Sequence, residues 1–229
     1  MKKNLRLLVV ICLVLFAALS IVWTMLLPDH FEDPHDGLLA IADAGTSAQI
    51  AALALSLSQL ACMIAFAGVA AWLHPTSPKL ATIGGTLTVL GGFGHAVFSG
   101  AEMARQVMAT DPDVNAAAAA QLQSFPPLMP FMVVGLIGTV LGLVFLGIAH
   151  IRSGAAPRWT GPVLLAFVLV EFVGSNFSQW ASYLSGLLLI GACAGLVVGL
   201  MRGVRPRPPS GEDRIGNHAP AAPMIRQNH

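Results

Sequence analysis

The chain has 229 residues, of which 55% are hydrophobic and 10% are charged, and its formal net charge at pH 7 is +1. Soluble domains carry about 25% charged residues, so the composition excludes a soluble catalytic domain and places most of the chain in a lipid bilayer. The near-zero net charge gives no reason to expect a nucleic-acid partner.

The N-terminal segment predicts a retained membrane-spanning helix. Lys2, Lys3 and Arg6 precede an apolar run over residues 7–27, which Pro28 ends. A cleaved signal peptide, the alternative, has an apolar core of about 7–15 residues followed by a small-residue cleavage site. This run is longer than such a core, so we favour a helix that stays in the membrane.

Five further apolar runs follow, each bounded by prolines, polar turns or charges. Each can cross about 30 Å of hydrocarbon at about 1.5 Å per residue, although the fifth is marginal. One long helix over residues 161–201 would exceed a single span, and the polar stretch at residues 174–179 indicates a tight hairpin. We therefore predict an all-α bundle of six membrane-spanning helices, at residues 7–27, 48–73, 80–104, 128–149, 161–177 and 181–201.

The charges predict the orientation of this bundle. With a cytoplasmic N-terminus and six spans, eleven of the twelve cations fall on the cytoplasmic side, and Arg105 is the exception. Cytoplasmic loops of membrane proteins are enriched in Lys and Arg. We therefore expect a multi-pass protein of a bacterial plasma membrane with both termini in the cytoplasm. Residues 203–229 are rich in proline and polar residues, which predicts a disordered cytoplasmic tail.

Two short helices are expected in the outer loops. Asp111 and Pro112 form an N-cap and N1 pair, and the Ala-rich stretch to Gln123 favours a helix outside the bilayer. Residues 38–44 are predicted to form an amphipathic turn or two before the second span.

Glycines mark faces for close helix contact. Gly191, Gly195 and Gly199 follow at four-residue steps in the sixth span, and Gly138 and Gly142 do so in the fourth. Such faces let neighbouring backbones approach closely. We favour packing within the chain, with self-association or a membrane-protein partner as the alternative.

The cysteines and histidines exclude several kinds of chemistry. Cys12, Cys62 and Cys193 lie one each in three spans without a CxxC pair, so dithiol chemistry and a disulfide framework are unsupported. His95 is the one histidine inside a predicted span, so a bis-histidine haem site lacks its second ligand. We expect no cofactor.

The polar groups within the spans predict one intramembrane cluster in the outer half of the bundle. Glu171 lies about 15 Å from the inner surface, close to the depth of Gln59 at about 16 Å from the outer surface, so the two can meet. Residues at three- and four-residue steps in the third span form a stripe that should face protein. The predicted cluster comprises Gln59, His95, Ser99, Glu102, Arg105 and Glu171.

Two interpretations of this cluster remain open. Ionisable groups inside a membrane are functional candidates, which favours a proton-responsive or ligand-binding cavity. The alternative is a hydrogen-bond network that fixes the register of the helices. For Glu102 and Arg105, three residues apart at the interface, we favour a surface ion pair.

The first outer loop contains nitrogen and oxygen ligands that suggest a metal site. His30 and His35 with neighbouring carboxylates could bind zinc. Their spacing matches no established helical metal motif, because Pro34 keeps the two histidines off one helix face. We therefore favour a solvated acidic loop and predict no metal.

The layout, with a basic start, an acidic first outer loop, six spans and Arg-terminated inner loops, resembles the uncharacterised small six-helix integral membrane proteins of GC-rich bacteria. The resemblance implies location and a helical bundle, and it carries no site residues. The function we expect is that of a non-enzymatic carrier-like or accessory or sensory membrane protein. The alternative is an intramembrane enzyme, a metal-assisted hydrolase that uses His95 and Glu171; one histidine is few for that chemistry.

Overall fold

The computed structural model describes residues 2–27, 33–155 and 157–202. This part of the chain is all-α and contains no strand. The predicted tail at residues 203–229 and the loop residue His30 lie outside it. In chain order the elements are α1 (Lys3–Leu26), α2 (Pro34–Ala44), α3 (Thr46–Leu73), α4 (Pro78–Met108), α5 (Pro112–Gln123), the 3-10 helix η1 (Pro126–Leu128), α6 (Met129–Ser153), α7 (Thr160–Phe172), the 3-10 helix η2 (Gly174–Asn176) and α8 (Gln179–Arg202).

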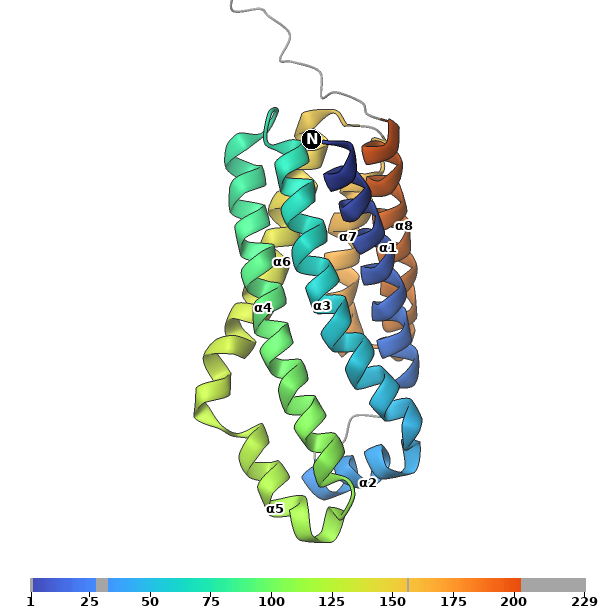
Figure 1. Ribbon diagram of the computed structural model, residues 1–229, viewed down its shortest axis with the longest axis vertical. Coiled ribbons are helices and arrows are strands. Elements are labelled where there is room, and N and C mark those ends of the chain that lie inside the picture. The colour runs from blue at the N-terminus through green and yellow to red at the C-terminus, as the bar shows by residue number, and fades with distance from the viewer. Residues whose placement is uncertain (1, 28–32, 156, 203–229) are drawn as a thin grey trace, which may run out of the picture.

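Six of these helices run along the long axis of the molecule and form a closed ring (Figure 1). Each packs against the next in the order α1, α3, α4, α6, α7, α8, and α8 returns to α1. The α1–α8 contact is the least extensive of the six. The short helices α2 and α5 contact each other at one end of the ring, beyond α3 and α4.

Length and composition indicate a membrane protein. Five helical segments in the described chain are long and apolar enough to cross a bilayer: α1, α3, α4, the η1–α6 segment and α8. Their outward faces carry many exposed large apolar side chains, such as Leu57, Leu90 and Ile137, as a lipid-facing surface requires.

Helix α7 is shorter than the apolar run that predicted it. The fifth apolar run was expected to be helical over residues 161–177, but α7 ends at Phe172. The polar hairpin begins early because the Ser175 hydroxyl donates to the Glu171 carbonyl and Gly174–Asn176 form a 3-10 turn. Gly, Ser and Asn favour turns. Val173 and Phe177 in the same stretch are apolar, so hydropathy alone does not indicate where the helix ends.

Glycines bring α4 and α6 into close backbone contact. A Cβ atom built on Gly138 would lie 2.8 Å from the Leu87 carbonyl oxygen and 2.9 Å from the Gly91 nitrogen. A Cβ on Gly142 would lie 2.5 Å from the Thr88 nitrogen. Only glycine allows backbones to approach this closely.

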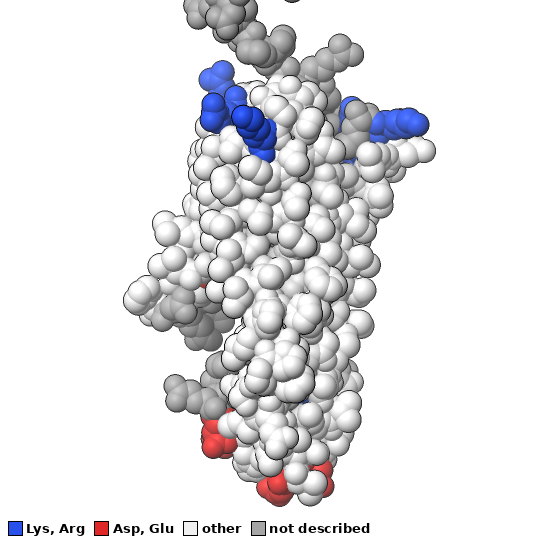
Figure 2. All heavy atoms as spheres, turned by 90° about the vertical axis from the view of Figure 1, so that its left-hand side faces the viewer, with Lys and Arg blue, Asp and Glu red and all other residues white. Residues whose placement is uncertain are grey.

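Most charged side chains are sorted by sign along the long axis, with Arg105, which packs against α2, and Glu171 of α7 as exceptions. Figure 2 shows Lys and Arg gathered at the end where α1 begins and α8 ends, and Asp and Glu at the opposite end, near α2 and α5. We refer to these as the basic end and the acidic end.

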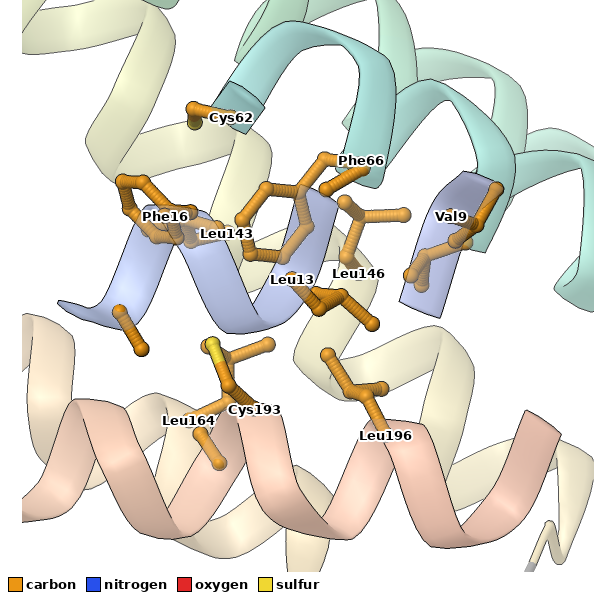
Figure 3. Close-up of a cluster of buried hydrophobic side chains, with 14 of the residues drawn as sticks. Val9, Leu13, Phe16, Cys62, Phe66, Leu143, Leu146, Leu164, Cys193 and Leu196 are labelled. Carbon is orange, nitrogen blue, oxygen red and sulfur yellow. The ribbon is translucent and has the colours of Figure 1, made fainter. Parts of the chain in front are cut away.

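The buried core fills the half of the ring that lies toward the basic end. It includes Val9 and Leu13 of α1, Phe66 of α3, Leu146 of α6 and Leu196 of α8, all of them at most 1% exposed (Figure 3). Each lies in the half of its helix that is nearer the basic end. The ring is therefore solidly packed on this side.

Candidate functional site

Between this core and the acidic end, the ring encloses a cavity of about 350 Å³. All six ring helices contribute residues to it. Phe16, Cys62 and Leu143, which belong to the core, also line the cavity and form its floor (Figure 3). Most of the remaining lining is apolar, and its polar side chains are Ser20, Thr24, Ser58, Gln59, His95, Thr139, Glu171, Ser182, Tyr183 and Ser185.

Glu171 lies in the last turn of α7, and its side chain reaches α8. Its Oε2 atom accepts a hydrogen bond from the Ser185 hydroxyl, and Ser185 is 3% exposed. None of the Lys and Arg residues that the structure describes forms an ion pair with Glu171. The carboxylate is therefore held by a hydroxyl group at the wall of the cavity.

Gln59 and His95 line the cavity together with Glu171. Gln59, on α3, donates from Nε2 to the Ser58 hydroxyl at 3.2 Å. The hydrogen bonds that the structure describes for Gln59 and Glu171 thus run to Ser58 and Ser185, and not to each other. His95 is half-buried on α4.

Ser99 lies one turn beyond His95, toward the acidic end. It accepts a hydrogen bond of 3.0 Å from Ser56 of α3 and donates to the Ala96 carbonyl at 2.8 Å. It does not line the cavity but joins α3 to α4 next to it. In this position Ser99 helps to fix the register of the two helices.

Glu102 and Arg105 form a separate group. The Arg105 Nη1 atom lies 3.2 Å from Glu102 Oε1, and neither residue lines the cavity. A Cβ built on Gly37 would lie 2.8 Å from Arg105 Nη2, so the guanidinium packs against α2. The six predicted residues therefore divide into a cavity group, Gln59, His95 and Glu171, and a group that ties α4 to its neighbours, Ser99, Glu102 and Arg105.

His35, the second candidate metal ligand, joins the two outer helices. Its Nε2 atom lies 2.9 Å from Asp113 Oδ1, which connects α2 to α5. The hydrogen bond to Asp113 raises the pKa of His35 above 6.5, and the nearby acidic groups Asp113, Asp36 and Asp33 add to this, while burial opposes it. Over the described residues, no group of three or more His, Cys, Asp or Glu side chains is arranged to hold a metal ion.

Comparison of the chain with protein-family models, with curated proteins and with solved structures gives no match. Its functional assignment therefore rests on the site itself.

The serines of α8 are among the site residues that sequence reasoning missed. Ser182 and Ser185 face the cavity three residues apart, on one side of the helix. The same spacing is visible in the sequence. Serine is common in membrane helices and inexpensive to bury, however, so its pattern is a much weaker signal than a buried carboxylate.

Proposed function

We propose that this chain is an integral membrane protein that binds a small molecule in the cavity, as a carrier or as an accessory or sensory component, without catalysing a reaction. The observation that carries the proposal is the cavity itself, to which all six ring helices contribute and into which Gln59, His95 and Glu171 converge. Mostly apolar cavities with a few convergent polar groups are the usual form of small-molecule sites.

We further propose that α7 is a sixth span and that both termini lie in the cytoplasm of a bacterial cell. At about 1.5 Å per residue, the 13 residues of α7 cover about 20 Å. This is less than the hydrocarbon thickness of about 30 Å, so the residues that flank α7 must lie in the bilayer as well. Trp159 precedes the helix and Trp180 follows the hairpin, and they are 48% and 80% exposed. Tryptophan prefers membrane interfaces, so the pair suits the two edges of a bilayer. The basic end would then face the cytoplasm, in agreement with the positive-inside rule.

Binding is favoured over the alternative, an intramembrane enzyme that uses His95 and Glu171. A metal-assisted hydrolase places about three protein ligands around its metal. Among the side chains lining the cavity, His95, Glu171 and Cys62 are the ones of metal-ligating type. Cys62 is 3% exposed within the floor, and the three do not form a ligand cluster.

A carrier would have to open the packed half of the ring. The cavity is bounded toward the basic end by the core, so in a carrier this structure would be the state that is closed toward the basic end. An accessory or sensory role requires no such opening. Self-association through Gly191, Gly195 and Gly199 is less favoured than packing within the chain, since a Cβ on Gly195 would lie 2.2 Å from Thr160 Oγ1 of α7.

Chemical modification of Gly186 tests the proposal. Gly186 lines the cavity, and a Cβ built there meets no heavy atom within 4 Å, so a cysteine fits. In a chain whose three native cysteines are replaced by alanine, we expect Gly186→Cys to react with a charged, membrane-impermeant thiol reagent applied from the acidic side.

Two control positions, one expected to be unreactive and one expected to be reactive, accompany this measurement. Leu169→Cys, at an outward position on α7 that is 63% exposed, should resist the same reagent because its thiol faces lipid. Asp113→Cys, in α5, should react at once. If Gly186→Cys stayed unmodified while Asp113→Cys reacted, the cavity would be sealed and the binding function would be refuted.

A further inference from the structure

The lining of the cavity identifies the class of ligand that it suits. We propose that it binds a lipophilic amine, an apolar molecule with one protonated nitrogen, which is received by Glu171. This inference rests on the proposed binding function and specifies its ligand.

The charges of the lining favour a cationic ligand over an anionic one. Among the described residues that line the cavity, Glu171 is the one Asp or Glu, and none is Lys or Arg. Arg105, a cation on the same half of α4 as His95, is engaged by Glu102 at 3.2 Å. A carboxylate in an apolar site is costly unless a cation or strong hydrogen-bond donors compensate it. A protonated amine would supply both a charge and donors to Glu171.

Aromatic rings make the site suitable for a cation in a second way. Trp23, Phe98, Phe167, Phe172 and Tyr183 line the cavity together with Glu171. The faces of aromatic rings attract ammonium groups, and this attraction is strongest where water is excluded. A cavity lined by a carboxylate and by aromatic rings can therefore hold a cationic head while its apolar walls hold the body of the ligand.

The mouth of the cavity favours a lipophilic ligand. Its exposed lining residues all belong to two helices: Thr24 and Met25 on α1, and Tyr183, Leu187 and Ile190 on α8. Met25 and Leu187 are 57% and 67% exposed. These two helices form the least extensive contact in the ring. The opening therefore lies between α1 and α8. Thr24 and Met25 in the last turn of α1 and Tyr183 near the start of α8 bring it to the acidic end, where a water-soluble reagent can enter. Leu187 and Ile190 extend it along α8, where a molecule dissolved in the bilayer can enter.

A pair of probes with the same ring and nearly the same size tests the charge requirement. The full chain, purified in detergent or nanodiscs, is titrated with 1-naphthylmethylamine and with 1-naphthylmethanol, and binding is followed by naphthalene fluorescence. We expect the amine to bind at least about 10-fold more tightly, as a charge-assisted hydrogen bond supplies. Glu171→Gln, which can still accept from Ser185, should remove this preference.

Matched glycine variants separate this inference from the proposed function. Gly186→Phe should fill the cavity and abolish binding of both probes. Gly100→Phe, also at a site with no heavy atom within 4 Å of its Cβ but outside the cavity lining, should leave both unchanged. Equal binding of the two probes, blocked by Gly186→Phe, would overturn the amine inference and leave the binding function intact.

The remaining outcomes are also decisive. If neither probe bound the wild-type protein, the amine inference would fail, and thiol modification at Gly186 would still decide the binding function separately. If the amine kept its advantage in Glu171→Gln, another group would receive the charge and the role of Glu171 would be refuted.

Discussion

The substitution Gly138→Ala measures how much the close contact of α4 and α6 contributes to stability. The added methyl carbon would lie 2.8 Å from the Leu87 carbonyl oxygen, 2.9 Å from the Gly91 nitrogen and 3.0 Å from the Gly91 Cα. All three are backbone atoms, so no side-chain rotation relieves the overlap and the two helices must move apart. Such overpacking costs about 1–3 kcal/mol, whereas alanine is favoured over glycine in a helix by about 0.5–1 kcal/mol. We expect a net loss of about 1–2 kcal/mol in the free energy of unfolding.

The matched control for this variant is Gly100→Ala. Gly100 is also helical, but a Cβ built there meets no heavy atom within 4 Å. The Gly100→Ala variant therefore gains the higher helix propensity of alanine without a steric overlap. Its free energy of unfolding should be unchanged or slightly higher. Both variants are compared with the wild type by equilibrium unfolding in mixed detergent micelles. If Gly138→Ala proved as stable as Gly100→Ala, the two helices would not be in contact at Gly138, and the proposed packing of the ring would be wrong there.

Three further predictions concern topology, packing and pH. Cysteines at positions 113 and 154 should be labelled from opposite sides of the membrane, the first from outside, and the reverse pattern would contradict the proposed orientation. Gly195→Leu should lower the melting temperature in detergent, because a Cβ there overlaps Thr160 Oγ1 at 2.2 Å; an unchanged melting temperature would mean that this face does not pack on α7. The pKa of His35 is raised in the folded protein by its bond to Asp113. The stabilisation of the folded protein by this pair is therefore complete below the pKa of His35 in the unfolded chain, 6.5. It is lost as the pH rises through the higher pKa of the folded protein. The difference in melting temperature between wild type and His35→Asn should shrink between about pH 5.5 and about pH 8.5, and a difference independent of pH would show that the pair contributes nothing.

Sequence patterns predicted the helices well because a bilayer imposes strong constraints on them. An apolar run in lipid must satisfy its backbone internally, so it forms a helix along most of its length. The outer helix α5 followed from local capping: Asp111 accepts a hydrogen bond from the Val114 amide at 3.4 Å at its start. The other outer helix, α2, begins at Pro34, four residues before the amphipathic segment that predicted it, because Asp33 caps it. The end of α7 was missed because hydropathy reports whether side chains prefer lipid, and Val173 remains apolar after the helix has ended.

The site was predicted in part for similar reasons. Depth alone predicted Gln59 and Glu171 at one level and His95 slightly nearer the outer surface, since helices of known direction advance by a fixed rise per residue. Depth does not determine which helices are neighbours in a ring. The sequence therefore did not predict that Ser185 would meet Glu171, or that Arg105 would turn toward α2.

The closure of the ring between α1 and α8 has a consequence for how the protein is made. These are the first and last helices of the described chain, so a growing polypeptide can form four of the six ring contacts in turn and must wait for α8 to form the last two. Until then Glu171 lacks Ser185, and one wall of the cavity is missing. The first helix must remain within reach in the bilayer throughout synthesis, with part of its inward face against lipid. A nascent chain arrested before α8 would thus hold most of the apolar core but not the complete site.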